Sequence, residues 1–302
     1  MTITYKRIRV LPLSGALGAE IEGVDASREQ DEETVREIRR AFAEHLVVFF
    51  RNQTLTPEQQ TRFAAVFGPL TRHPFIKTMP EHPYVAPLIR DADASGPTFG
   101  GDWHCDATFL EEAPLGSLLY AVEIPPYGGD TCFSNLILAY EKLSAGMREM
   151  LDTLVLIHSA AGAYDPDIGN KSANAQTQQK GIGIEVTDDP RKEMEHPLVR
   201  THRESGRKAL WIPGAYGMRF KGWTPEESKS LLDFLYQHVS KPHFTCRFRW
   251  QAGSLAMWDN RATQHIAIND YSGFRRVMHR VQVGGERPFG PAMPLAKPLK
   301  AA

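Results

Sequence analysis

The stretch DWHCDATF, residues 102–109, places an imidazole and a carboxylate two positions apart, directly after the glycines at 100 and 101. Side chains two apart on a strand lie on the same face. We therefore expect His104 and Asp106 to present one nitrogen and one oxygen atom close enough to bind the same metal ion. The pair alone is a weak signal, because single histidines also occur in protein cores and an aspartate also suits a turn.

A third candidate ligand, His265, follows a WDN turn that ends the predicted strand SLAMW. Only the fold can bring His265 to the first pair, because the two lie far apart in the sequence. Two histidines and one carboxylate on one face of a metal ion are the ligand set of non-heme Fe(II) oxygenases, which leaves positions open for a co-substrate and dioxygen. The 3 cysteines form no CxxC pair, so a thiolate metal site is not expected.

Two arginines lie on the predicted strand RRVMHR near the end of the chain. Arg276 and Arg280 are separated by an even number of residues, so we expect both to face the same interior. Buried guanidinium groups need anions, which two anionic compounds in one pocket supply. The simpler interpretation is that both are solvated strand residues paired with acids such as Glu286.

Three clear helices are predicted. Residues 27–46 begin with a serine and carry acids early and bases late, and 56–68 begin with a threonine and a proline and end at a glycine. Residues 224–239 repeat the threonine and proline start, and a shorter helix is expected at 139–151. Strands or hairpins are expected at 6–13, 16–25, 47–53, 115–126, 129–140, 151–160, 196–213, 245–260 and 275–285.

Many short strands with a few peripheral helices predict a mainly β fold with flanking helices, a double-sheet or barrel-like arrangement. The absence of an internal repeat or a Pro/Ser-rich linker favours a single domain over residues 1–302. The polar segment 164–193 is expected to be a mobile insert over this fold.

The composition is close to neutral, with 35 Lys and Arg against 36 Asp and Glu. Such a balance gives no signal for a nucleic-acid or membrane partner. The sequence contains neither a signal-peptide-like start nor an apolar run of membrane-spanning length, and its cysteines form no disulfide pattern. We therefore expect a cytoplasmic protein.

Taken together, these stretches resemble the taurine dioxygenase and aryloxyalkanoate dioxygenase family of Fe(II)/2-oxoglutarate enzymes. The resemblance runs along almost the whole chain, through LGAEIEGVD, VVFFRNQ, FGPL, WHCDATF, GGDTCF, EHPLVRTH, WDNRATQH and HRVQVGGERP. It implies a double-stranded β-helix, also called a jelly roll. It also implies an enzyme that uses Fe(II), 2-oxoglutarate and O2 to hydroxylate a small organic anion, with release of succinate and CO2.

By this resemblance, His104, Asp106 and His265 are the iron ligands. Thr131 and Arg276 match the residues that hold the distal carboxylate of 2-oxoglutarate. The chemistry agrees, because an arginine offers a bidentate fork to a carboxylate and a threonine adds one donor.

For the substrate, Arg280 matches the residue that pairs with the anionic end, and His73 is expected to be a second donor. Where the taurine enzyme has a tyrosine and an asparagine, this chain has Ile76 and Gly100, so two polar contacts to taurine are missing. With Phe109 also near the mouth, we expect preference for an anion with an alkyl or aryl body. Aryloxy-acids, alkyl sulfates, larger sulfonates and similar carboxylates fit that description.

Three alternatives stay open at this point: a taurine dioxygenase proper, a non-catalytic metal-binding β-sandwich protein, and a zinc hydrolase. Neither of the last two needs a co-substrate clamp such as Thr131 with Arg276. We further expect a homo-oligomer whose partner is a small anionic substrate, with no nucleic acid or membrane partner.

Overall fold

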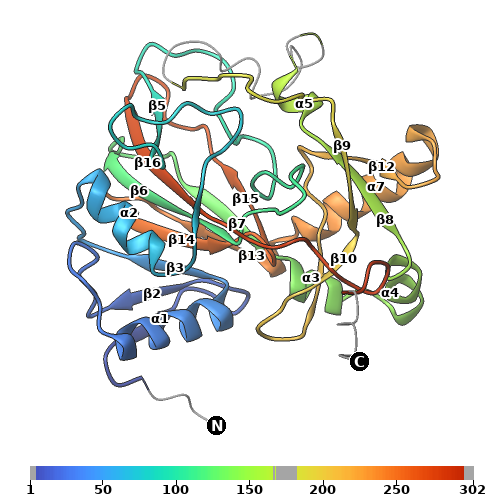
Figure 1. The fold of residues 1–302 in the computed structure, drawn as a ribbon, viewed down its shortest axis with the longest axis horizontal. Coiled ribbons are helices and arrows are strands. Elements are labelled where there is room, and N and C mark those ends of the chain that lie inside the picture. Colours follow the sequence, from blue (N-terminus) through green and yellow to red (C-terminus); the bar gives the residue numbers. More distant parts are fainter. Residues whose placement is uncertain (1–4, 166, 168–181, 296–302) are drawn as a thin grey trace, which may run out of the picture.

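The computed structural model describes residues 5–165, 167 and 182–295. At its centre lies a sheet of 8 strands in the order β1-β2-β3-β14-β6-β16-β4, with β5 beside β16 (Figure 1). Only β2 and β3 pair in parallel; the other described pairs of this sheet are antiparallel. Its strands are β1 (Arg9–Pro12), β2 (Ala19–Glu22), β3 (Val47–Phe50), β4 (Leu70–Thr71), β5 (Ala86–Arg90), β6 (Gly116–Glu123), β14 (Leu255–Asp259) and β16 (Arg276–Val283).

Three smaller sheets complete the β structure. The first has the order β13-β7-β15, the second the order β12-β8-β9, and the third is the hairpin β10-β11. Their strands are β7 (Thr131–Asn135), β8 (Val155–Ser159), β9 (Glu193–Pro197), β10 (Val199–Thr201), β11 (Lys208–Leu210), β12 (Gly217–Phe220), β13 (Thr245–Phe248) and β15 (Thr263–Ala267). The predicted mainly β fold with flanking helices is thus present.

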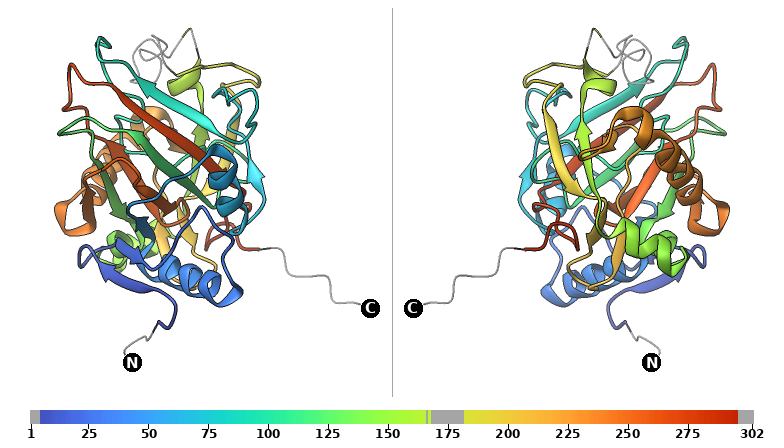
Figure 2. Two further views of the ribbon diagram at one scale, coloured as in Figure 1. Left: turned by 90° about the vertical axis from the view of Figure 1, so that its left-hand side faces the viewer. Right: turned by 90° about the vertical axis from the view of Figure 1, so that its right-hand side faces the viewer.

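The alternation of β3 shows how the central sheet is buried on both faces. Val47 and Phe49 pack in a cluster with Phe133 of β7 and Phe248 of β13, so this face lies against the sheet β13-β7-β15. Val48 and Phe50 point the other way, under α1 (Glu32–His45) and α2 (Pro57–Ala65). Figure 2 shows the two helices on the outside of the sheet. Such a strand is apolar at every position because both of its faces are covered.

A second group of helices packs in one apolar cluster: α3 (Leu136–Glu141), α4 (Ala145–Leu151), α7 (Pro225–Val239) and the 3₁₀ turn Pro242–Phe244. Helix α5 (Ala161–Tyr164) packs in a separate cluster with Phe75 and Phe109. Helices α2 and α7 begin with capping boxes at Thr56 and Thr224, as their sequences predict. None of the described helices is long and apolar enough to cross a membrane.

Several predicted boundaries were wrong: the single helix expected at 139–151 is the end of α3 followed by α4, and three further cases show the physical reason. Helix α1 begins after Asp31, whose carboxylate accepts the N–H of Thr34, and not after the serine at 27. The expected strand 129–140 ends at Asn135, whose side chain caps α3. The stretch 245–260 is not one hairpin, because β13 pairs with β7 while β14 pairs with β3 and β6. In each case a local pattern competed with a side-chain cap or a long-range pairing that the pattern does not contain.

Half of the expected insert, residues 166 and 168–181, lies outside the described residues. The described end of it runs beside the segment that follows His73. Lys77 donates its N–H to the carbonyl of Gly183 at 2.7 Å, and Ile76 and Ile184 form a β-bridge. Residues 182–187 are therefore tied to the neighbourhood of the candidate substrate residues.

Candidate active site

A reciprocal backbone pairing brings the two candidate histidines together. His104 donates its N–H to the carbonyl of His265 at 3.0 Å, and His265 donates to the carbonyl of His104 at 2.8 Å. The imidazole rings are consequently 4.2 Å apart, centroid to centroid. His265 lies on β15, inside the fold, so this pairing closes the long gap in sequence between the two residues.

The two-residue spacing predicted that Asp106 lies on a strand, but this prediction was wrong. Asp106 opens the turn 106–109, in which Ala107 has a φ of 47°. Asn260 accepts the backbone N–H of Asp106 at 3.2 Å, and Ser117 of β6 donates its hydroxyl to Oδ2 at 2.6 Å. Oδ1 of Asp106 then lies 3.7 and 4.0 Å from the Nε2 atoms of the two histidines. A turn, not a strand, brings the carboxylate to the imidazoles.

The local environment favours the ligand forms of these side chains. Burial, reinforced by the nearby His104, lowers the pKa of His265 to about 3, so the imidazole is neutral. Burial opposes the charge of Asp106, but Arg280 and the two histidines outweigh it and lower the pKa of the carboxyl. Nδ1 of His104 lies 2.7 Å from the carbonyl oxygen of Asp102, which can only accept. The proton of His104 is therefore on Nδ1, and Nε2 is available to a metal.

This donor set fits Fe(II). The candidate ligand atoms of His104, Asp106 and His265 all lie within 4.8 Å of one another, and all three residues are buried. Such separations are expected of atoms that share one metal ion. Two neutral imidazoles and one carboxylate match the ligand set of Fe(II) oxygenases and leave further coordination positions for other molecules.

A cavity of about 50 Å³ adjoins the two histidines. Its other lining residues are Leu88, Phe99, Gly100, Leu119, Thr131, Trp258, Ala267, Arg276 and Arg280. Gly100 has a φ of 72°, and a Cβ atom at this position would lie 3.1 Å from Cε1 of His104. A larger residue here would therefore press on the candidate ligand ring.

One end of this cavity is suited to a carboxylate. The hydroxyl of Thr131 accepts the indole N–H of Trp250 at 3.0 Å, which leaves the hydroxyl proton of Thr131 for another acceptor. Nε of Arg276 is buried and has no hydrogen-bond partner among the described residues, and burial lowers the pKa of this guanidinium. An unpaired buried donor is costly, so an anion at this position stabilises it.

Arg280 is paired with Asp106 on one side of its guanidinium. Its Nη1 donates to Oδ1 of Asp106 at 3.2 Å. Nε and Nη2 are buried and have no hydrogen-bond partner among the residues described. These two nitrogens form the side of the guanidinium that can hold an oxyanion through two parallel bonds. Arg280 thus contacts a candidate ligand and still offers a fork.

His73 lies in a cluster of buried rings beside the site. Its Nδ1 accepts the N–H of Phe75 at 3.1 Å, so the neutral ring carries its proton on Nε2. Burial and the nearby Arg280 keep the pKa of His73 well below its usual value. The ring of Phe109 stands edge-on to that of His73, with centroids 5.8 Å apart. Ile76 is buried and pairs with Ile184, which packs at the border of the same cluster.

Four residues near the site were missed by sequence reasoning. Asn260 and Ser117 hold Asp106, while Tyr164 and Tyr216 pack with His73 in the ring cluster. The WDN turn contained a signal for Asn260, because an asparagine directly after a strand and before a ligand is placed to bond a neighbouring backbone. No comparable signal exists for the other three, which reach the site only through the fold.

The fold has two β layers, and it holds two imidazoles and a carboxylate at one point. A cavity with a cationic end lies beside them. Together these features define an Fe(II)- and 2-oxoglutarate-dependent dioxygenase. The chain belongs to the taurine catabolism dioxygenase TauD, TfdA family, whose model matches residues 9–282.

Several characterised proteins are similar over nearly their full length. The chain is 38% identical over 285 residues to an alpha-ketoglutarate-dependent sulfate ester dioxygenase of Pseudomonas putida, covering 93% of this chain and 91% of that protein. It is 35% identical over 286 residues to an alkylsulfatase of Acinetobacter baylyi, covering 94% and 87%. The crystal structure of a taurine dioxygenase from Burkholderia xenovorans is 39% identical, with a TM-score of 0.79 and coverage of 95% and 94%. The predicted double-stranded β-helix and the predicted enzyme class are thereby confirmed.

Proposed function

We propose that this dioxygenase acts on alkyl sulfate esters and hydroxylates the carbon atom that bears the sulfate group. The single observation behind this choice is the buried, unpaired Nε and Nη2 fork of Arg280, which lies beside Asp106 and the two histidines. The similarity to a sulfate ester dioxygenase and to an alkylsulfatase supports the same substrate class.

The surroundings of Arg280 fit an anion with an apolar body. His73 offers its Nε2 proton near the guanidinium, while Phe75 and Phe109 supply buried apolar surface. An alkyl sulfate has both features, since its head is anionic and its chain is hydrocarbon. Taurine carries an ammonium group instead, and we propose that Ile76 and Gly100 leave that group without polar partners.

For the co-substrate, we propose that Arg276 and Thr131 hold the distal carboxylate of 2-oxoglutarate. The buried Nε of Arg276 and the hydroxyl proton of Thr131 are the donors at that end of the cavity. His104, Asp106 and His265 would hold the metal at the other end. Trp250 fixes the direction of the threonine hydroxyl through its indole N–H.

When bound, Fe(II) supplies the oxidation of a C–H bond by O2, coupled to oxidative decarboxylation of 2-oxoglutarate to succinate and CO2. The protein holds the carbon that bears the sulfate close to the metal through the contacts of Arg280 and His73. Hydroxylation there gives a hemiacetal sulfate. Its C–O bond to sulfate breaks, the hydroxyl loses its proton, and an aldehyde and hydrogen sulfate leave.

The test is an assay of the purified protein with Fe(II), 2-oxoglutarate and O2. Hexyl sulfate, hexanesulfonate, 2,4-dichlorophenoxyacetate and taurine are compared by kcat/KM. We expect hexyl sulfate to be the best of the four, with one succinate, one hexanal and one sulfate formed per turnover. A higher kcat/KM for any of the other three compounds would show that the substrate class is wrong.

We further propose that the protein is a single domain over residues 1–302, is located in the cytoplasm and forms a homo-oligomer. The described cysteines, Cys105, Cys132 and Cys246, are all unpaired thiols, which agrees with a reducing compartment. Light scattering on the eluting protein tests the oligomer, and a mass equal to that of a single chain would contradict it.

A further inference from the structure

We propose that the hydroxyls of Tyr164 and Tyr216 belong to the substrate-binding site and hold the sulfate oxygen that Arg280 does not reach. This inference rests on the proposed function, because it assigns two further residues to the same anion site.

The two phenols form a chain of polar groups with His73. The hydroxyl of Tyr164 lies 3.4 Å from Nε2 of His73, and the side chain of Tyr216 is close enough to interact with that of Tyr164. Both phenols are close enough to Arg280 and Asp106 to interact with their charges. Tyr164 is 1% exposed and Tyr216 is 3% exposed, so solvent does not satisfy these groups.

Their rings are already fixed by apolar packing. The ring of Tyr164 stacks on that of Phe75, with centroids 4.8 Å apart. The ring of Tyr216 stands edge-on to that of Phe109 at 5.1 Å and to the candidate ligand His104 at 6.5 Å. Phenylalanine would make the same ring contacts. The ring contacts therefore do not require the two hydroxyls, which are hydrogen-bonding groups in addition to the packing.

The chain of groups has more protons than acceptors. Nδ1 of His73 is used by the N–H of Phe75, so His73 acts only as a donor through Nε2. Nε2 and the two hydroxyls bring three protons, but only the two phenol oxygens can accept them. At least one proton must therefore find an acceptor outside the chain, whether it comes from His73 or from a phenol. The carboxylate of Asp106 already accepts from Ser117 and Arg280.

Burial raises the pKa of Tyr164 to about 12 and that of Tyr216 well above its usual value, so both stay protonated donors at neutral pH. The surplus proton of the chain, together with Nε and Nη2 of Arg280, gives three donor positions. A sulfate monoester has three terminal oxygens. A carboxylate has only two, both of which the fork of Arg280 can hold. The set of donors therefore favours a sulfate ester over a carboxylate of equal chain length.

The test uses Tyr164→Phe and Tyr216→Phe, with Tyr140→Phe as the matched control. Tyr140 on α3 is another buried tyrosine, and its hydroxyl donates to Oδ1 of Asp152 at 2.8 Å. Binding of hexyl sulfate and of hexanoate is measured by calorimetry on protein loaded with Mn(II) and 2-oxoglutarate, without O2. Loss of a hydrogen bond to a charged group raises the dissociation constant by about 10-fold or more.

We expect each site variant to weaken hexyl sulfate binding by about 10-fold and hexanoate binding by less than about 3-fold, while the control changes neither. The ratio of the two dissociation constants is decisive, because it does not depend on the fraction of active protein. Either single variant suffices if the other does not fold. The inference is overturned if the variants that fold keep a ratio of the two dissociation constants within about 2-fold of that of the wild type. A wild-type protein that binds hexanoate better than hexyl sulfate overturns the proposed function instead.

Discussion

Three polar contacts hold Asp106 in place. Its backbone N–H is held by Asn260, one carboxylate oxygen by Ser117 and the other by Arg280. A carboxylate held at three points needs little reorganisation when a metal binds. It is also the only anionic member of the candidate ligand set.

Replacing Asp106 should therefore remove metal binding. We expect Asp106→Ala to lose Co(II) binding by at least about 100-fold and to form no succinate. Asp102→Ala is the matched control, because this carboxylate is exposed and only its backbone carbonyl contacts His104. Calorimetric titration with Co(II) is the measurement. Undiminished binding by the alanine variant at 106 would exclude this residue as a ligand.

The cationic end of the cavity predicts a change in the KM for 2-oxoglutarate. Arg276→Leu should raise that KM by about 10- to 100-fold, since a hydrogen bond to a charged group contributes about 1.5–3 kcal/mol. Thr131→Val should have a smaller effect, because it removes one neutral donor. The neighbouring Arg275 pairs with Asp91 and Glu123 at the surface, so Arg275→Leu serves as the control. Equal, negligible effects at 276 and 131 would place 2-oxoglutarate elsewhere.

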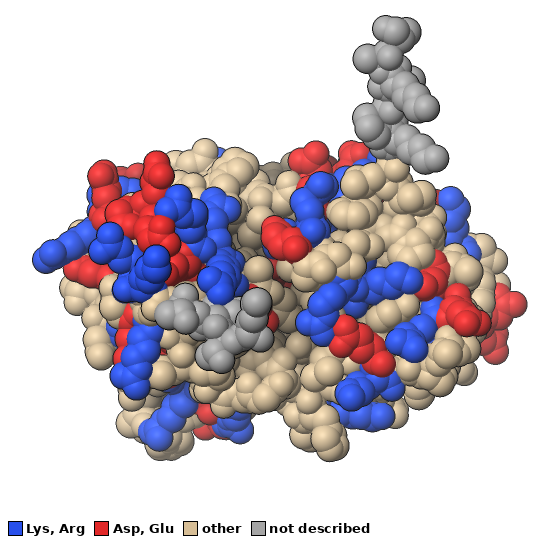
Figure 3. Space-filling view, turned by 90° about the horizontal axis from the view of Figure 1, so that it is seen from below, with Lys and Arg blue, Asp and Glu red and all other residues tan. Residues whose placement is uncertain are grey.

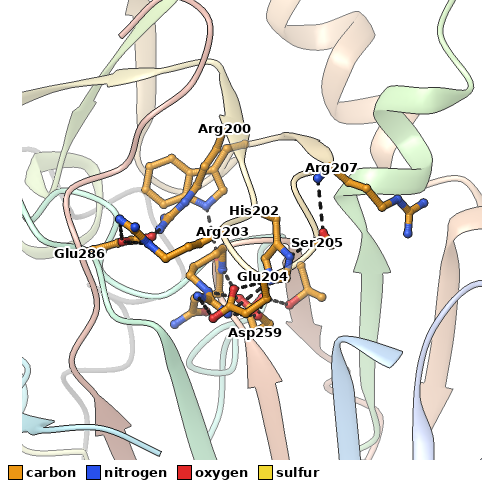
Figure 4. Close-up of polar contacts among 12 residues, drawn as sticks. Arg200, His202, Arg203, Glu204, Ser205, Arg207, Asp259 and Glu286 are labelled. Atoms are coloured by element: carbon orange, nitrogen blue, oxygen red, sulfur yellow. Dashed lines mark hydrogen bonds and ion pairs between the residues drawn. The ribbon is translucent and has the colours of Figure 1, made fainter. Parts of the chain in front are cut away.

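The hairpin β10-β11 supports the turn that carries Asn260. His202, at the tip of the hairpin, and Arg261 both bond the buried carboxylate of Asp259, and Glu204 of the tip pairs with Arg261. Figure 4 shows His202 and Asp259 facing one another, while Arg207 extends away from them. Burial opposes the charge of Asp259, but Arg261 outweighs it and lowers the pKa of the carboxyl. An ion cluster thus fixes the residue that directly precedes Asn260.

Breaking this cluster should destabilise the protein and loosen the metal site. Asp259→Asn leaves Arg261 without its buried partner, a change that costs about 3–5 kcal/mol. Arg207→Gln at the same hairpin removes only an exposed pair with Glu141, which costs less than about 1 kcal/mol. Thermal unfolding and Co(II) affinity should both fall in the first variant and not in the second. Equal melting temperatures would contradict a structural role for the cluster.

Elements with a strong local pattern were predicted well. Helices α2 and α7 carry their capping residues in the sequence, and β3 is a short apolar run ended by a turn. The turn 106–109 was not predictable, because it depends on the bond from Asp106 to Asn260. For the same reason, the candidate metal ligands could be chosen from residue types and the resemblance, whereas Ser117 and the two buried tyrosines could not.

At the scale of the molecule, the net charge gives no general attraction for an anion. Figure 3 shows basic and acidic side chains intermixed over the face seen from below. The chain as a whole has a formal net charge of −1. Arg276 and Arg280 instead present unpaired donors inside the fold, where screening by salt is weak.

Buried histidines predict how the stability of the whole molecule depends on pH. Burial lowers the pKa of His196 to about 4 and holds that of His158 well below its usual value. Both are neutral when folded and take up a proton on unfolding below about pH 6.5. Stability is therefore full above pH 6.5 and is lost as the pH falls toward 4. His196 alone should account for about 2 kcal/mol between pH 7.5 and 5.

Urea unfolding at the two pH values is the measurement. His196→Gln keeps a donor for the carbonyl of Leu110 but cannot titrate, so the difference between pH 7.5 and 5 should shrink by about 2 kcal/mol. His243→Gln, at an exposed histidine, should leave the difference unchanged. A difference that stays the same in the first variant would mean that His196 is protonated in the folded protein.

The reciprocal pairing of His104 with His265 also fixes when the metal site forms during synthesis. His104 emerges from the ribosome early, but its pairing partner on β15 is made only after most of the chain has been translated. Until then two of the three candidate ligands, His104 and Asp106, lie in a loop that lacks this backbone pairing. A chain that stops before residue 265 lacks both the third ligand and this support. Tight capture of a redox-active metal is thereby deferred until the strands that enclose it have been synthesised.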